Sequence, residues 1–376
     1  MIYFDSAAST SPSQDVLDLF VKSNVNQFAN PAAAHALGRD AGRELEECRK
    51  AVLTAFHVDK THSLAFLSGA TEANNLAIKG VAFSYQNRGK KLLFSASEHP
   101  SVTEPMRYLA SAFGFEAIEL PVDALGRVEP DTLRSCMDKN VILVSIMGVN
   151  NETGAINDLK ALAKIVHEYP KAYFHSDLTQ AVGKIEVPYS DIDLFSFSAH
   201  KLHGLKESGA LVYKSFIRFV PLAHGGGQER GFRSGTVSLA LNQCLCLAVQ
   251  NSLRNPKADE AKVRPLFDAL YEGLQNEPVT INSYREGSPY VLNFSLNVHR
   301  ASVIMEALSQ KGIYVSTTSA CSTRSDHPSS TLLAMGKDMD TASNSIRVSF
   351  STDNTLKEVH RFLEVLHQLL KEVHPR

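Results

Sequence analysis

Short apolar runs alternate with amphipathic stretches along the first two thirds of the chain. The apolar runs have the length of strands and occupy residues 64–68, 92–95, 115–120, 141–147, 172–177, 194–198 and 209–213. Between two of them, residues 158–169 repeat apolar side chains at the spacing of one helix face and stop before Pro170. Strands that alternate with helices are typical of a mainly parallel sheet. We therefore predict an α/β fold whose large domain is a mainly parallel sheet flanked by helices.

The pattern changes after residue 255 and predicts a smaller α+β domain. A helix interrupted by Pro265 is expected first. Apolar runs follow at 279–282, 290–296, 313–316 and 345–351, with helical stretches at 302–311 and 355–373. We expect a large domain over 15–255 and a small C-terminal domain over 256–376. The N-terminal segment 1–14 is expected to pack with the small domain.

Composition and charge exclude several classes of protein. The chain has 376 residues, of which 38 are Lys or Arg and 40 are Asp or Glu, so its formal net charge is −2. Because positive and negative charges nearly balance, the protein has no positive electrostatic field that would hold a polyanion. We therefore expect no direct contact with nucleic acid. The apolar runs fall far short of the ~18 residues of a membrane helix, and the first residues carry no basic leader. We expect a cytoplasmic protein with no membrane partner.

The chain has five cysteines. Their odd number, and the absence of the spacing that is typical of a disulfide framework, argue against disulfides. Cys244 and Cys246 lie in an apolar run and are interpreted as buried helix residues rather than as a metal or redox pair. Cys321 lies instead in a polar stretch at about 316–330 that predicts a surface loop. About eight residues of tether, at ~3.3–3.6 Å each, would let its thiol travel over ~20 Å. An exposed thiol can reach the thiolate form that attacks sulfur.

Polar side chains collect where the predicted strands end. Ligands of an open parallel sheet bind beyond the carboxyl ends of its strands, so these positions are the first candidates for a site. The strand at 64–68 runs into Gly69-Ala70-Thr71-Glu72, which opens a helix. The free N–H groups and the positive end of the dipole at a helix start suit a phosphate. The alternative interpretation of this motif is that it only caps the helix. The later strand ends carry Asn151, Asp177, Gln180, Ser198, His200 and Lys201.

Each of these residues alone fits a turn or a cap, but together they match the needs of pyridoxal phosphate. This cofactor requires an anchored phosphate, an amine for a Schiff base and a partner for its pyridinium nitrogen. Burial favours loss of the lysine proton, so Lys201 is the candidate nucleophile, and Asp177 is the candidate pyridinium partner. Gln180 and Asn151 are candidates to bind the ring oxygen or a substrate carboxylate.

Two further residues complete the candidate site. His99 follows the strand at 92–95, where it is expected to stack on the ring and move protons near neutral pH; a structural histidine is the alternative. Arg347 lies in the run at 345–351, where its planar fork suits a substrate carboxylate. An ordinary salt bridge is the alternative for Arg347.

These residues resemble the cysteine desulfurases of the class V aminotransferase family, which belong to fold type I of the pyridoxal phosphate enzymes. The resemblance covers nearly the whole chain. One sequence block alone would be weak evidence for the family, but the full set of blocks in this order is specific evidence. The blocks are Gly69-Ala-Thr-Glu, Asn75-Leu-Ala-Ile-Lys-Gly80, Glu98-His99-Pro, Val149-Asn-Asn-Glu152, Thr179-Gln180, Ser198-Ala-His-Lys201, His224-Gly-Gly-Gly, Arg233-Ser-Gly-Thr236, Ser319-Ala-Cys321 and Ser345-Ile-Arg347.

The resemblance implies a role for each residue. Lys201 carries the Schiff base, and Cys321 attacks the sulfur of L-cysteine to form an enzyme persulfide, leaving alanine. Arg347 binds the substrate carboxylate, with Asn30 and Asn151 nearby. The implied cofactor-binding residues are Ala70, Thr71, His99, Asn151, Asp177, Gln180, Ser198, His200, Lys201 and Thr236. Because Thr236 is implied to reach the phosphate of the neighbouring subunit, a homodimer is expected.

Some positions depart from the common pattern of the family. Gly148 stands where many members have histidine, Leu178 replaces a small residue, and Thr317-Thr318 stands where a serine-glycine pair is common. The segment from Cys321 to residue 336 has the long form of members that hand sulfur to acceptor proteins. The chain also ends without the longer tail of members that serve iron-sulfur scaffolds. We therefore expect a dedicated sulfur-acceptor protein, with a tRNA-thiolation enzyme as the candidate.

Two alternatives remain open at this point. The first is another lyase or aminotransferase of the same fold, such as a selenocysteine lyase, for which Cys321 is dispensable or discriminates sulfur from selenium. The second is a non-catalytic scaffold that keeps the fold and binds a partner. Full cysteine turnover by Cys321→Ser would refute the persulfide route and favour the first alternative. A yellow cofactor absorbance that is lost in Lys201→Ala would argue against the second.

Overall fold

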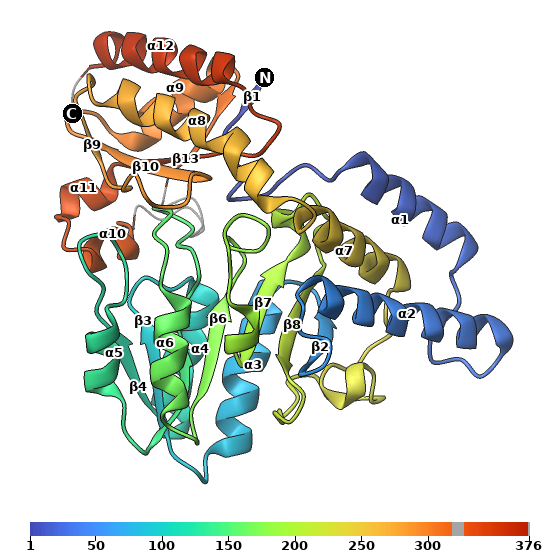
Figure 1. Cartoon of the computed structure of the whole chain (residues 1–376). Helices are drawn as coiled ribbons and strands as arrows, with labels where there is room; N and C mark the ends of the chain where they lie inside the picture. Colours follow the sequence, from blue (N-terminus) through green and yellow to red (C-terminus); the bar gives the residue numbers. More distant parts are fainter. Residues whose placement is uncertain (318–326, 375–376) are drawn as a thin grey trace.

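All seven strand-length runs of the large domain form one sheet in the computed structural model, which describes residues 1–317 and 327–374 (Figure 1). The strands lie in the order β2-β8-β7-β6-β5-β3-β4, and β8 runs antiparallel to both neighbours while the other pairs are parallel. Their bounds are β2 His62–Leu67, β3 Lys91–Ser95, β4 Glu116–Leu120, β5 Val141–Ser145, β6 Tyr173–Asp177, β7 Leu194–Ser198 and β8 Gly209–Lys214. The predicted α/β fold class is confirmed.

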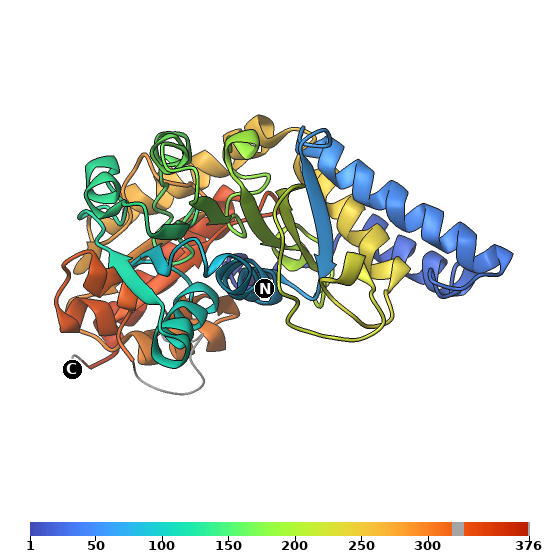
Figure 2. The ribbon, with the colours of Figure 1, turned by 90° about the horizontal axis from the view of Figure 1, so that it is seen from below.

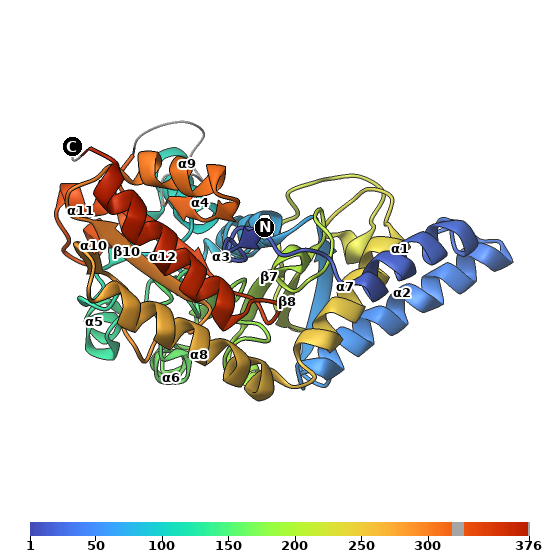
Figure 3. The same ribbon diagram turned by 90° about the horizontal axis from the view of Figure 1, so that it is seen from above.

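Helices cover both faces of this sheet. The helices are α1 Gln14–Asn26, α2 Ala36–Ala55, α3 Ala70–Tyr85, α4 Pro100–Phe113, α5 Pro130–Cys136, α6 Leu159–His167 and α7 Leu239–Ser252. Figures 2 and 3 show α3 and α4 on one face and α5 and α6 on the other. Each face has its own apolar core, because residues of α3 and α4 pack in one cluster and residues of α2, α5, α6 and α7 in another. Cys244 and Cys246 are buried on α7, as expected.

The C-terminal part of the chain forms a four-stranded antiparallel sheet with helices packed against it. The sheet has the order β12 Ser316–Thr317, β13 Ser345–Ser349, β10 Val291–Leu296 and β9 Val279–Ile281. The helices and the remaining strand are α8 Pro256–Leu274, α9 Ala301–Gln310, β11 Ile313–Tyr314, α10 Ser330–Ala334, α11 Met339–Ser343 and α12 Leu356–Glu372. This arrangement agrees with the predicted α+β character.

The predicted interruption at Pro265 is wrong, because α8 continues through this residue. A proline removes one backbone donor and crowds the preceding turn, which costs about 3 kcal/mol in a helix interior. Val263, Phe267 and Leu270 of α8 are fully buried in the core beneath the small sheet. Tertiary packing of this apolar face therefore outweighs the local cost.

The first residues of the chain join the small sheet to the large one. Strand β1, Ile2–Tyr3, pairs in parallel with β11, and Phe4 packs edge-on against Phe350 and Phe362. Five residues further on, the Ser9–Thr10 region reaches the large sheet, where the Thr10 N–H donates to the His200 carbonyl at 2.8 Å. The N-terminal segment therefore contacts both parts of the molecule and, as described below, enters the site.

The structure describes only the two ends of the stretch at about 316–330 that the sequence predicts as a loop. Ser316–Thr317 forms strand β12 because it pairs with β13, and Ser330 begins helix α10 with the Ser329 hydroxyl as its N-cap. Both ends are fixed by contacts that the polar composition does not reveal. Cys321 lies outside the described residues. No helix within residues 1–317 and 327–374 is long and apolar enough to cross a membrane.

Candidate active site

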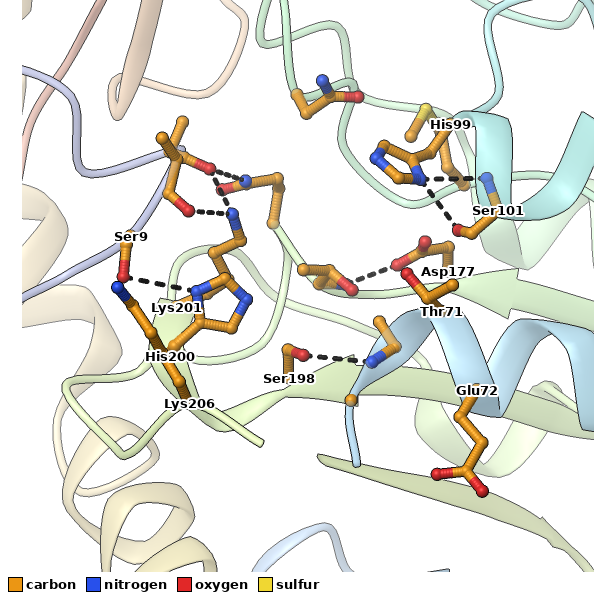
Figure 4. Close-up of a pocket in the computed structure, with 18 of the residues that line it drawn as sticks. Ser9, Thr71, Glu72, His99, Ser101, Asp177, Ser198, His200, Lys201 and Lys206 are labelled. Carbon is orange, nitrogen blue, oxygen red and sulfur yellow. Dashed lines mark hydrogen bonds between the residues drawn. The ribbon is translucent and has the colours of Figure 1, made fainter. Parts of the chain in front are cut away.

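A cavity of about 550 Å³ lies beyond the carboxyl ends of β2, β5, β6 and β7 (Figure 4). Its walls come from segments that are far apart in the sequence, including the N-terminal segment and β13 of the small sheet. Ten of the residues predicted from the sequence line it, namely Ala70, Thr71, His99, Asn151, Asp177, Gln180, Ser198, His200, Lys201 and Arg347. The large sheet brings nine of them together because the ends of its parallel strands share one edge, whereas Arg347 comes from β13 of the small sheet.

One end of the cavity is suited to a phosphate. Helix α3 begins there at Ala70, whose N–H donates to the Ser198 hydroxyl at 3.0 Å. A Cβ at Gly69 would lie 3.0 Å from the same hydroxyl, so glycine permits the close approach of this turn. The helix start supplies N–H groups and the positive end of a dipole, and Lys206 also lines the cavity. Burial, followed by the charge of Lys201, lowers the pKa of His200 to about 4, so its ring is neutral at pH 7.

Lys201 is held against the N-terminal segment. Its ammonium nitrogen donates to the carbonyl oxygens of Ala7 and Ala8, both at 2.6 Å. Gln180 reaches the same place, since its Nε2 donates to the Ala7 carbonyl at 2.9 Å and its Oε1 accepts from Lys184 at 2.8 Å. The N-terminal segment therefore sets the position of both side chains at the cavity wall.

Asp177 and His99 form the opposite side of the cavity. One carboxylate oxygen of Asp177 accepts the Thr179 backbone N–H at 2.9 Å. His99 precedes Pro100 as the N-cap of α4, and its Nδ1 accepts the Ser101 backbone N–H at 3.1 Å. Burial is the main cause that lowers the pKa of His99; the charge of Asp177 opposes this shift and that of Lys201 adds to it.

Arg347 enters the cavity from β13 and is 4% exposed. Its Nη2 lies 2.9 Å from the Asp5 carboxylate, and its Nη1 donates to the Asn151 carbonyl at 3.1 Å. The salt bridge that the sequence left as an alternative is thus present, with a partner that sequence reasoning missed. The buried Nε has no hydrogen-bond partner among the described residues. The guanidinium therefore retains donors for an anion such as a carboxylate.

Two predicted residues that the structure describes do not line this cavity. Asn30 is exposed between α1 and α2, which extend away from the rest of the molecule in Figure 1. Thr236 is exposed in the segment that precedes α7. Neither residue lines the cavity of its own chain. The position predicted for Cys321 is not tested, because this residue lies outside the described ranges.

Both ends of the described chain around Cys321 nevertheless lie at the site. On one side Ser316 of β12 pairs directly with Arg347 of β13. On the other side the Ser329 hydroxyl donates to the partly buried carboxylate of Glu152, the residue after Asn151. Burial raises the pKa of Glu152, while Ser329 and Arg347 act in the opposite direction.

Sequence reasoning missed Asp5, Lys184 and Lys206, as well as the backbone of residues 7–9. Lys184 follows Thr179-Gln180 by one helical turn, and this spacing was the available signal. Nothing local marks the N-terminal residues, because strand pairing 300 residues later in the chain brings them to the site; Ile2 pairs with Ile313.

Two departures from the family pattern compensate each other. A Cβ at Gly148 would lie 2.8 Å from Leu178 Cδ2 and 3.1 Å from the Ala181 Cβ. Leu178 is fully buried. The large residue at 178 therefore occupies the space that a side chain at 148 needs, and neither change removes a group from the cavity.

Known proteins resemble this chain in architecture and in sequence. The model of the aminotransferase class-V family matches residues 2–362. A cysteine desulfurase IscS of Dictyoglomus turgidum is 35% identical over 377 residues, which cover 99% of this chain and 95% of that protein. The structure of a NifS-like protein superposes with a TM-score of 0.92 at 33% identity and covers 99% of this chain and all of that one. A structure titled SspA in complex with cysteine has a TM-score of 0.80 at 30% identity and covers 94% of this chain and 99% of that one.

The chain belongs to the class V aminotransferase family. Within it, the chain is a pyridoxal phosphate-dependent cysteine desulfurase of the IscS/NifS type. The cavity fits this cofactor. It has a volume of about 550 Å³, and its walls provide a helix start for the phosphate, a carboxylate for the ring nitrogen and a lysine amine for the Schiff base. When bound, pyridoxal phosphate supplies an electron-withdrawing ring that stabilises negative charge on the substrate.

Proposed function

We propose that the protein moves the sulfur of L-cysteine onto Cys321 as a persulfide and releases alanine. In this reaction the C–S bond of cysteine breaks, an S–S bond to the Cys321 sulfur forms, and the carbon skeleton takes up protons to become alanine. The observation that carries the proposal is the meeting of Lys201, Asp177 and Arg347 in one cavity. The complex of SspA with cysteine supports the choice of substrate.

The residues of the chain have distinct roles in this proposal. Arg347 binds the substrate carboxylate with the donors that Asp5 and the Asn151 carbonyl leave available. Lys201 holds the cofactor covalently and moves protons at the substrate. The described residues on either side of Cys321 support its delivery, because Ser316 pairs with Arg347 of the cavity wall and Ser329 contacts Glu152, which follows Asn151 of that wall.

We further propose a cytoplasmic homodimer that hands the persulfide sulfur to an acceptor protein, with a tRNA-thiolation enzyme as the candidate. Thr236 and Asn30 are exposed and outside the cavity of their own chain, which agrees with contributions to the site of a second copy. A pull-down with the persulfide-loaded protein tests the acceptor. Recovery of an iron-sulfur scaffold alone contradicts this part of the proposal.

The decisive experiment feeds cysteine and a reductant to the purified protein and measures alanine and sulfide together. We expect equal yields, and mass spectrometry without reductant should find one added sulfur atom on Cys321. Cys321→Ser should lose both products but keep the cofactor absorbance. Cys136→Ser, a change at a partly buried cysteine of α5, is the matched control and should behave like the wild type.

Other results reject the proposal. Full cysteine turnover by Cys321→Ser excludes the persulfide route and favours a different lyase of this fold. Sulfide accompanied by pyruvate indicates an elimination instead of a desulfuration. Turnover of selenocysteine but not cysteine indicates a selenocysteine lyase.

A further inference from the structure

A buried polar network connects His99 to Asp177 behind the cavity wall. Its centre is Asn74 of α3, which is fully buried. The Asn74 Nδ2 lies 2.8 Å from Asp177 Oδ2 and 2.8 Å from Ser101 Oγ. Ser101 Oγ lies 2.8 Å from His99 Nδ1, and the Ser196 hydroxyl donates to Asn74 Oδ1. Four segments of the chain therefore meet at one asparagine.

The direction of each hydrogen bond follows from the chemistry of the partners. A carboxylate only accepts, so Asn74 must present its NH₂ group to Asp177 and its oxygen to Ser196. The second Nδ2 hydrogen is given to Ser101 Oγ. Ser101 then donates its own hydroxyl hydrogen to His99 Nδ1, which also accepts the Ser101 backbone N–H.

These donors determine the tautomer of His99. Because Nδ1 accepts two hydrogen bonds, the single hydrogen of the neutral ring must reside on Nε2. Figure 4 shows that the other ring nitrogen lies on the side away from Ser101, toward the interior of the pocket. Burial lowers the pKa of His99; the charge of Asp177 acts against this shift and that of Lys201 reinforces it. The neutral ring is therefore favoured near pH 7.

We propose that Asn74 and Ser101 are positioning residues that fix His99 as the Nε2–H tautomer while they hold the Asp177 carboxylate. His99 then meets the substrate as a neutral hydrogen-bond donor, and it has no free lone pair with which to act as a base. The same asparagine orients Asp177, the residue that would pair with the ring nitrogen of the cofactor. This inference rests on the proposed function, in which the cavity that His99 and Asp177 line holds the cofactor and the substrate.

Nitrogen NMR of the protein labelled with ¹⁵N-histidine reads the tautomer directly, in the cofactor-free and loaded forms. His99→Gln assigns the signal. In the wild type we expect protonated Nε2 and unprotonated Nδ1 between about pH 6 and 8. Ser101→Ala removes the hydroxyl donor to Nδ1, and Asn74→Leu frees that hydroxyl to turn and accept a hydrogen bond. Both variants should admit some of the Nδ1–H form, because only the longer bond from the Ser101 backbone N–H, at 3.1 Å, then opposes a hydrogen on Nδ1. Ser101→Thr keeps the hydroxyl and should restore the wild-type signal.

Kinetics provide the second readout. Both variants should lower kcat by about 10- to 100-fold with KM changed less than about threefold, since a misplaced proton affects the transition state more than binding. Among the residues that the structure describes, the side chain of the neighbouring Asn75 donates to the Thr71 carbonyl alone, so Asn75→Leu is the matched control and should leave both readouts unchanged. Thermal unfolding checks each variant, and if Asn74→Leu fails to fold, Ser101→Ala decides.

A wild-type His99 protonated on Nδ1 overturns the inference, as do variants that keep both the Nε2–H signal and the wild-type kcat. These outcomes differ from a failure of the proposed function. An enzyme with His99 fixed as Nε2–H that forms no persulfide on Cys321 contradicts the function alone. A persulfide formed by an enzyme with the other tautomer contradicts this inference alone.

Discussion

Arg347 shows how a buried cation stays available for an anionic substrate. The charge is compensated by Asp5 and one carbonyl, which offsets the cost of burial, and Nε remains without a partner among the described residues. The planar fork has more donors than these two contacts use. A lysine has the same charge but cannot make the bidentate contact.

We therefore predict that Arg347→Lys lowers kcat/KM for cysteine by about 10- to 100-fold, mainly through KM, because a charge-assisted contact to the substrate is lost. Steady-state kinetics measure the split. Arg361→Lys alters an exposed ion pair with Glu364 and should have no effect. A fall in kcat at constant KM would show that Arg347 does not anchor the substrate.

Lys184 is expected to make the stability of the protein depend on pH. Burial, followed by the charges of Lys201 and Arg347, lowers the pKa of Lys184 from 10.5 to about 7. Between these values the unfolded chain binds a proton that the folded chain does not. The unfolding free energy should therefore rise with pH from about 7 to 10.5, by at most about 1.4 kcal/mol per pH unit from this group.

Lys184→Met should reduce this dependence, and unfolding curves at several pH values between about 7 and 9.5 measure it. The same substitution at exposed Lys164 on α6 is the control and should leave the slope unchanged. An unaltered slope in Lys184→Met would mean that Lys184 keeps an ordinary pKa in the folded protein.

At the scale of elements, the end of β5 and the turn after β6 are packed against each other through Gly148 and Leu178. Packing there is tight enough that a single methyl group has no room, since the Cβ would approach Leu178 to 2.8 Å. The two positions are therefore expected to be energetically coupled.

A double-mutant cycle tests this coupling. Gly148→Ala should destabilise the protein by about 1–3 kcal/mol through overpacking, and Leu178→Ala should cost about 2–5 kcal/mol. The double variant should be more stable than the sum of the two predicts, because the smaller side chain admits the new methyl group. Denaturant unfolding gives the free energies. Strict additivity of the two effects would contradict the proposed contact.

At the scale of the whole molecule, the proposed homodimer completes each site with Thr236 of the other copy. Lys201→Ala and Thr236→Ala chains can then be mixed and refolded together. In a mixed dimer one site lacks both the Lys201 and the Thr236 side chains, and the other site has both of them. Mixing should therefore restore wild-type affinity for pyridoxal phosphate to that intact site, whereas Thr236→Ala alone should bind about tenfold more weakly.

Spectroscopic titration of the cofactor measures these affinities. A mixture of Lys201→Ala with wild-type chains is the control for subunit exchange. If Thr236→Ala weakens binding equally in mixed and unmixed samples, each chain uses its own Thr236 and the shared site is wrong. A monomer in sedimentation experiments leads to the same conclusion.

The sequence alone determined the alternation of strands and helices, and with it the sheet edge at which polar residues collect. This succeeded because hydrophobic periodicity and strand-end chemistry are local properties, so Asp177, Lys201 and the turn at Gly69 could be found one segment at a time. The continuity of α8 through Pro265 and the ends of the polar stretch at 316–330 could not be found this way, since packing and strand pairing fix them.

Only the tertiary structure decided which residues support the site from a distance. Asp5 and the carbonyls of Ala7 and Ala8 reach it because β1 pairs with β11 at the far end of the chain. The proposed role of Asn74 depends on three hydrogen bonds to residues of three other elements. A hydrogen bond depends on the position of both partners in space, and a sequence pattern specifies such positions within one element but not between distant ones.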